Sequence, residues 1–256
     1  MNVSSLSYTE KYELVRDPDI DVTHLVQLAK DADTDLLCYV AEHPSCPATL
    51  LEDLAHDSES VVRCCVAGNR NTPGHLLVTF ASDKDWDVRH AAAENANLPV
   101  KLMSQLAQDE YEDVRCGVAA NRNCTVELLV TLASDDDDGV RSQVARHHHC
   151  PATLLVTLVG DDGTDVQSNA QRALRSKDSA FWAKVILEGF SLSTPIGRGS
   201  TQKASGEILL EAKLSDVYQS IQSAEIALRI TETTSNPAGF AEPDQNSIPR
   251  TSSLRM

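Results

Sequence analysis

The sequence predicts an all-α fold, an α-solenoid of about five to six repeated two-helix units of 26 residues followed by a helical tail. The first observation behind this prediction is a column of branched apolar residues 26 positions apart, without insertion or deletion. This column holds Val62, Val88, Val114, Val140 and Val166, with Leu36 one step earlier. The second observation is that further columns keep the same period, among them Ala41, Ala67, Ala93, Ala119 and Ala145, and Leu54, Phe80, Leu106, Leu132 and Leu158. Self-similarity at a short fixed period is the sequence signature of repeat architectures.

Each unit is expected to form two short helices. The second helix is predicted to begin at Thr72-Pro73, with Thr72 as the N-cap and Pro73 at the first helical position, where a missing N–H costs nothing. Three further prolines hold the same place, namely Pro47, Pro99 and Pro151. The first helix follows an acidic residue, as in Asp87-Val88, and spans about two turns, so part of it is expected to be 3₁₀. Neither helix can bury its apolar face by itself, so stacked units must bury each other's faces.

The ends of the chain depart from the repeat pattern. We expect residues 1–35 to form an N-terminal cap with a partial repeat, and residues 36–190 to form the solenoid and its closing helix. Residues 191–205 are rich in Ser, Thr and Gly and predict a linker, and residues 206–232 predict an amphipathic helix. The short a/d seam of that helix comprises Leu210, Leu214, Val217, Ile221, Ala224 and Leu228. Residues 233–256 lack an apolar pattern and predict a disordered tail.

The repeat resembles that of a known family. The pattern VRxxVAxNxxTPxxLLxxLAxD is matched closely by residues 62–83 and 88–109 and is similar to the leucine-rich repeat variant, over roughly residues 10–175. The resemblance implies a right-handed superhelix in which α- and 3₁₀-helices alternate. A member of that family also carries an N-terminal iron–sulfur module with cysteine ligands. Residues 1–37 of this chain contain no cysteine, so neither that module nor any other cofactor is expected.

Composition excludes several functional classes. The formal charge of −16 disfavours sequence-independent binding of nucleic acid and of anionic membranes, which both depend on Lys and Arg. No segment reaches the roughly 18 apolar residues of a membrane span, and the N-terminus does not resemble a secretory signal. The seven cysteines form no disulfide framework, so we expect a reduced, cytoplasmic location.

The cysteines are distributed over repeat columns. One column holds Cys38, Cys64 and Cys116, a second holds Cys46, Cys124 and Cys150, and Cys65 stands apart. Members of one column lie about 8–10 Å apart across packed helices, too far for two thiolates to share one zinc ion. Burial as small residues is therefore the favoured interpretation, with a reactive or metal-binding thiol as the alternative. The run from His147 to Cys150 raises the same alternative, but its register favours a polar loop, and no metal site is predicted.

Two polar columns are interpreted as structural ladders. Arg63, Arg89, Arg115 and Arg141 each lie next to acidic loops, so salt bridges between neighbouring units are expected. Asn69, Asn95 and Asn121 form the second ladder, which His43 and His147 join, and they are expected to hydrogen-bond the backbone of turns.

The acidic loops, 83–87, 109–113, 135–138 and 161–165, predict an electronegative rim. Their spacing lacks the terminal Glu of an EF-hand, so calcium is not expected. A solvated rim or a surface that steers a basic partner remain the two interpretations. Trp86 and Tyr111 lie in this rim and are either binding anchors or packed on the next repeat. The residues predicted to bind a partner are Trp86, Tyr111, Asp85, Asp137, Arg146 and His148.

The sequence contains neither a GxSxG nor a GxGxxG motif, and no feature of it predicts an enzyme. We expect a non-catalytic scaffold or adaptor that binds another protein with a basic surface. A metal- or redox-linked accessory protein that uses the Cys and His residues is the alternative. Self-association through residues 206–232 is a further expectation.

Overall fold

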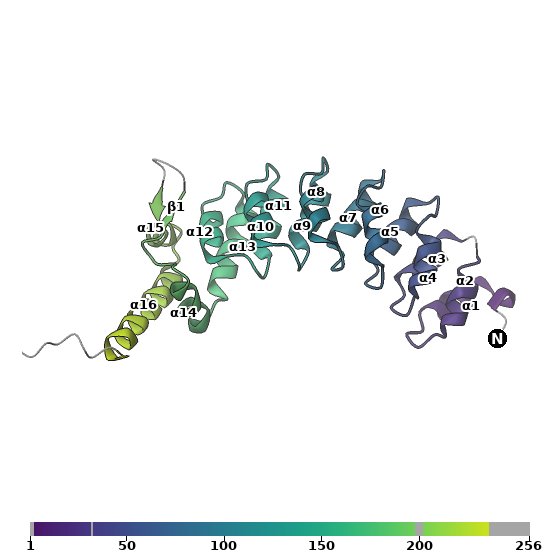
Figure 1. Cartoon of the computed structure of the whole chain (residues 1–256), viewed down its shortest axis with the longest axis horizontal. Coiled ribbons are helices and arrows are strands. Elements are labelled where there is room, and N and C mark those ends of the chain that lie inside the picture. Colours follow the sequence, from purple (N-terminus) through teal and green to yellow (C-terminus); the bar gives the residue numbers. More distant parts are fainter. Residues whose placement is uncertain (1–2, 32, 198–201, 236–256) are drawn as a thin grey trace, which may run out of the picture.

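The computed structural model describes residues 3–31, 33–197 and 202–235, which form a curved stack of short helices (Figure 1). Within these residues six helix pairs succeed one another along the chain. The first helices of the pairs are α1 (Tyr8–Val15), α3 (Thr34–Glu42), α5 (Ser60–Gly68), α7 (Trp86–Glu94), α9 (Glu112–Ala120) and α11 (Asp138–Arg146). The second helices are α2 (Val22–Leu28), α4 (Ala48–Leu54), α6 (Gly74–Phe80), α8 (Val100–Leu106), α10 (Val126–Leu132) and α12 (Ala152–Val159). A 3₁₀ turn, η1 (Val3–Ser5), precedes them. The predicted all-α solenoid is confirmed.

The first helices form one continuous row, in which α3, α5, α7, α9, α11 and α13 (Thr164–Arg175) pack directly on their neighbours. The valine and alanine columns of this row are fully buried, for example Val88 and Ala93. Small alanine side chains let these helices approach closely. The second helices contribute the larger core residues, such as Phe80 and Leu106.

Both helices of each unit are α-helices, so the predicted alternation of α and 3₁₀ is wrong in the described residues. Hydrogen bonds of the i→i+4 type close the short second helices, as from Ala81 N–H to the Leu77 carbonyl at 2.9 Å. The i→i+4 geometry brings Leu76, Leu77 and Phe80 onto one buried face. A 3₁₀ helix of this length would have poorer hydrogen-bond geometry and a narrower apolar stripe.

The second helix also begins one position later than predicted. Pro73 is the N-cap, with extended backbone, and Gly74 is the first helical residue. Thr72 is buried, and its hydroxyl donates to the Val66 carbonyl at the end of the preceding helix. Thr125 replaces proline in this column and accepts a hydrogen bond from Leu128 N–H at 3.4 Å.

The N-terminal segment contains a complete helix pair, whereas the sequence predicted a partial repeat there. Val15 and Leu28 are buried one period before Ala41 and Leu54. The pattern weakens because Glu10 stands where later units have a branched apolar residue.

At the C-terminal end, α14 (Ser179–Leu187) and two further helices cover the last unit. The helix predicted over 206–232 is divided into α15 (Ser205–Glu211) and α16 (Ser215–Ser235). Lys213 adopts a positive φ of 59° between them. Leu214 N–H donates to the Leu209 carbonyl and Lys213 N–H to the Leu210 carbonyl, which is the Schellman pattern of a helix end.

The segment predicted as a linker contains paired backbone. Strands β1 (Pro195–Ile196) and β2 (Lys203–Ala204) form a short antiparallel ladder ahead of α15. Helix α16 packs on α14, α15 and α13, and four seam residues, Leu214, Val217, Ile221 and Ala224, are buried, whereas Leu210 is exposed. Self-association through 206–232 stays a prediction, and most of its seam is occupied within the chain. The predicted disordered tail begins too early, because α16 extends to Ser235, and residues 236–256 lie outside the described residues. No helix of the described part combines the length and apolar character needed to cross a bilayer.

Candidate interaction surfaces

The arginine column connects the loops of consecutive units. The Arg89 guanidinium donates two hydrogen bonds to the Asp109 carboxylate, at 2.7 and 3.0 Å, and two more to the backbone carbonyls of Asp83 and Lys84. Each arginine therefore bonds the loop before its own helix and the loop of the next unit. The equivalent pairs are Arg63 with Asp83, Arg115 with Asp135, and Arg141 with Asp161.

The carboxylates of this ladder are held in their charged form. Burial acts to raise the pKa of Asp109, but hydrogen bonds from Arg89 and from the Tyr111 N–H outweigh burial, and the pKa lies below its ordinary value. The same balance lowers the pKa of Asp83, Asp135 and Asp161. These aspartates belong to the framework and are not free to contact a partner.

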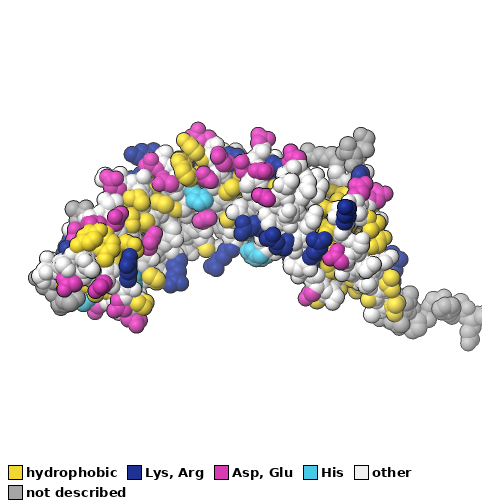
Figure 2. Space-filling view, turned by 180° about the vertical axis from the view of Figure 1, so that it is seen from behind, with side chains coloured by type: hydrophobic (Ala, Val, Ile, Leu, Met, Phe, Trp, Pro, Cys, Tyr) yellow, Lys and Arg dark blue, Asp and Glu magenta, His cyan; other side chains and the backbone are white. Residues whose placement is uncertain are grey.

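The loops 83–87, 109–113, 135–138 and 161–165 form what we call the acidic edge, at the N-terminal ends of the first helices. Figure 2 shows acidic side chains along the upper border of the middle of the stack and Lys and Arg side chains along the lower border. Negative charge at helix N-termini is favourable because it faces the positive end of the helix dipole. The exposed acidic side chains of this edge include Glu110, Glu112 and Asp136.

Four of the predicted partner-binding residues lie at the acidic edge. The rings of Trp86 and Tyr111 stack on each other, with centroids 5.9 Å apart, and each remains about 40% exposed, at 39% and 41%. Asp85 accepts a hydrogen bond from Arg63 at 2.7 Å, and Asp137 caps α11 by accepting from Val140 N–H. The two aspartates thus have structural contacts, whereas the aromatic pair presents a flat exposed surface.

The other two predicted residues, Arg146 and His148, lie at the opposite edge, at the C-terminal end of α11. They line a small hollow of about 200 Å³ beside Gln143 and His147. One nine-residue helix separates them from Asp137, so the structure does not bring the six predicted residues together.

The asparagine column connects the units at the opposite edge. The Asn121 side-chain amide donates to the carbonyls of Ala93 and Asn95, at 2.7 and 2.8 Å, and its oxygen accepts from Asn123 N–H. Ala93 lies in the last turn of α7, where backbone carbonyls lack a partner within their own helix. Each asparagine therefore caps the first helix of the preceding unit.

His147 reproduces two of the three asparagine contacts with an imidazole ring. Its Nδ1 accepts from His149 N–H at 3.1 Å and its Nε2 donates to the Asn121 carbonyl at 3.1 Å. These roles require the neutral ring with the proton on Nε2. Burial lowers the pKa of His147, which agrees with a neutral ring.

We expect His147 to make the fold less stable in mild acid. Because its folded-state pKa is lowered, the unfolded chain binds the proton more readily, and stability falls as pH drops below the unfolded value of about 6.5. The loss is complete once pH is below the folded-state pKa. Replacement of His147 by Asn retains both kinds of hydrogen bond and removes the titration. Urea unfolding of both chains at about pH 7.5 and about pH 5 measures the difference. An equal decrease in the two chains would contradict the assignment.

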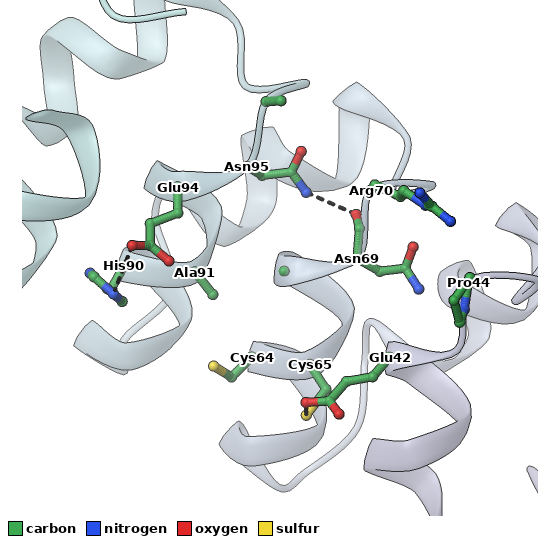
Figure 3. Close-up of a pocket in the computed structure, with 12 residues that line it drawn as sticks. Glu42, Pro44, Cys64, Cys65, Asn69, Arg70, His90, Ala91, Glu94 and Asn95 are labelled. Atoms are coloured by element: carbon green, nitrogen blue, oxygen red, sulfur yellow. Dashed lines mark hydrogen bonds and ion pairs between the residues drawn. The ribbon is translucent and has the colours of Figure 1, made fainter. Parts of the chain in front are cut away.

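An open groove lies on the face formed by the first helices (Figure 3). Its volume is about 610 Å³. We call it the first-helix groove and define it by the residues that line it at α3, α5 and α7, namely Glu42, Cys64, Cys65, Gly68, His90, Ala91 and Glu94. Arg70 lies at its rim. This site is not predictable from the repeat pattern because it depends on small residues, above all Gly68, between two glutamates of the same column.

The cysteine thiols are held in the protonated form. Burial raises the pKa of Cys46 and Cys150 to about 12, and that of Cys64, Cys116 and Cys124 to about 11. Burial also raises the pKa of Cys38 and Cys65. The thiolate is the reactive and metal-binding form, so these environments disfavour the redox-linked alternative. In residues 3–31, 33–197 and 202–235, no group of three or more His, Cys, Asp or Glu side chains is arranged to hold a metal ion.

Comparison with known proteins returns solved structures of helical repeat proteins. One is described as a leucine-rich repeat variant with a novel repetitive structural motif; its identity is 26% over 69% of this chain and 72% of that chain, with a TM-score of 0.48. Its description names the repeat type that the sequence pattern resembles. Escherichia coli YibA is similar at 19% identity over 72% of this chain and 80% of that chain, with a TM-score of 0.48. An engineered protein is similar at 15% identity over 87% and 76%, with a TM-score of 0.42. No family model and no curated protein matches the chain.

Proposed function

We propose that this chain is a non-catalytic scaffold that binds another protein through the surface of its repeat stack. The observation that carries the proposal is that two sets of hydrogen bonds connect consecutive units. Arginine side chains make these bonds at one edge of the stack and asparagine side chains make them at the other, so exposed side chains keep fixed spacings over many units. Such a surface binds without a large loss of conformational freedom.

The partner is expected to have a basic surface. The chain carries a formal charge of −16, and acidic side chains gather on one edge. Complementary charge accelerates association and selects among partners. The stacked pair of Trp86 and Tyr111 adds exposed aromatic area within the same edge, and aromatic residues are enriched among binding hot spots.

The proposal is tested by capture from the native cell extract at low and moderate salt. The immobilised full chain is compared with a variant carrying Glu110→Gln, Glu112→Gln and Asp136→Asn, exposed residues whose side chains receive no hydrogen bond from the ladder arginines, so that the backbone bonds of the ladder are kept. A matched control carries Glu13→Gln, Asp53→Asn and Glu188→Gln, which change the charge equally on other surfaces. We expect to find a protein that binds the native chain and the control at low salt but does not bind the edge variant. Capture of no protein, or equal capture by all three chains, would contradict the proposal.

A further inference from the structure

The first-helix groove exists because two consecutive units, at α5 and α7, carry small side chains in its floor. Gly68 ends α5, and a Cβ added there would meet no atom within 4 Å. Cys64, Cys65 and Ala91 form the rest of the floor (Figure 3). Both thiols have acceptors within the chain, Cys64 the Asp87 carbonyl at 3.6 Å and Cys65 the Glu42 carboxylate at 3.4 Å.

The groups that remain for a ligand are mostly hydrogen-bond acceptors. The Nδ1 of His90 lies 2.7 Å from the Asp113 carbonyl and must carry the proton, so in the neutral ring Nε2 is an acceptor. This Nε2 lies 3.8 Å from the Glu94 carboxylate, which is 54% exposed. Glu42 and Glu94 are the last residues of α3 and α7, where the negative end of the helix dipole adds to their charge.

The two glutamates hold the same repeat position two units apart. At about 8–10 Å between packed helices, their backbones are separated by about 16–20 Å. An extended chain advances about 3.3 Å per residue and its side chains alternate between two faces, so about six residues span this distance and bring both side chains onto the same face. One side chain of a ligand cannot contact both carboxylates, but two side chains of an extended segment can.

We infer that the first-helix groove binds an extended segment of the partner protein that carries two arginine or lysine side chains about six residues apart, one for Glu42 and one for Glu94. Small residues between the two cations lie over Gly68 and the cysteines. Arg70 at the rim repels a third cation between them. The inference rests on the proposed function, because it names the chemistry of the bound partner.

The test uses fluorescein-labelled peptides of nine residues, composed of glycine and serine with two arginines six positions apart. One control peptide has glutamates in place of both arginines, and a second retains one arginine. Fluorescence anisotropy with the full chain is expected to show that the two-arginine peptide binds about 2–5-fold more tightly than the one-arginine peptide, as for one exposed ion pair, and that the glutamate peptide does not bind.

Two glycine variants separate the groove from general effects on the fold. Gly68→Leu fills the groove, whereas Gly74→Leu adds the same side chain at the start of α6, where a Cβ also meets no atom within 4 Å. We expect Gly68→Leu to weaken binding of the two-arginine peptide about 10-fold and Gly74→Leu to leave its affinity unchanged. Glu42→Gln and Glu94→Gln should each weaken binding of this peptide about 2–5-fold, and Arg70→Glu should strengthen its binding by a similar factor.

The outcomes distinguish the groove from the scaffold role. Equal binding of the arginine and glutamate peptides, or no effect of Gly68→Leu, overturns the inference, while a partner captured through the acidic edge would still support the scaffold. Peptide binding with the expected variant effects supports the groove, even where extract capture yields no partner and the scaffold role fails.

Discussion

Replacement of Asn121 by Ala is expected to lower the free energy of unfolding by about 2–4 kcal/mol, as three hydrogen bonds in a buried position are lost. Two of these bonds satisfy the carbonyls of Ala93 and Asn95 in the preceding unit, and the third orders the turn at Asn123. Asn121 is 1% exposed, so water cannot replace the lost partners without opening the stack. Urea unfolding followed by circular dichroism at neutral pH measures the change.

Two control variants make this result specific. Asn123→Ala removes an exposed amide that donates to the Ala96 carbonyl at 2.7 Å, and should cost less than about 1 kcal/mol. Asn121→His should restore part of the loss, because His147 makes two of the three contacts one unit later. Equal effects of Asn121→Ala and Asn123→Ala would show that the asparagine ladder does not stabilise the stack.

Replacement of Arg89 by Ala is expected to destabilise the chain by about 3–5 kcal/mol, the usual range for removing one partner of a buried ion pair. The side chains of Arg89 and Asp109 are each 10% exposed, so the variant leaves a carboxylate largely shielded from water. Two backbone carbonyls lose their donor as well. Arg89→Lys should recover part of the stability, because one ammonium cannot make the same four bonds.

Acid titration checks the assignment of Arg89. The folded-state pKa of Asp109 is lowered, so this group contributes stability that is present above its unfolded value of about 3.9. That stability is lost as pH falls through the folded-state pKa. In Arg89→Ala the pKa of Asp109 should rise, so the difference in stability between the two chains should shrink in acid. A difference that stays constant down to about pH 3 would contradict a role through Asp109.

The solenoid was predictable from sequence because every unit places the same columns in the same environment. A buried valine or alanine recurs at a fixed interval, and this interval identifies the buried face of the helix without any knowledge of the helices that pack on it. The arginine–aspartate pairing was expected for the same reason. The α1–α2 pair was underestimated because Glu10 interrupts the valine column. The break at Lys213 depends on a local left-handed residue, which the apolar spacing of the seam does not reveal.

The interaction surfaces were less predictable because they depend on which way each side chain points and on whether another residue of the chain already bonds it. Asp85 and Asp137 have the charge expected of a binding surface, yet an arginine and a helix N-terminus already use them. The first-helix groove depends on the absence of a side chain at Gly68 and on glutamates in two other units. In the sequence, the glycine and the two glutamates look like ordinary variations within a repeat, whereas the folded chain places them around one hollow.

Each kind of bond between units joins residues at one constant separation in the sequence. This regularity determines which insertions and deletions in the gene the fold can accept. Arg89 bonds a residue 20 positions ahead, and Asn121 bonds residues 26 and 28 positions behind, as their counterparts do in other units. Excision or duplication of any 26-residue segment inside the stack joins equivalent positions and leaves each bond with a donor and an acceptor. The molecule can therefore be lengthened or shortened by whole modules, while an insertion of another length would put both edges out of register.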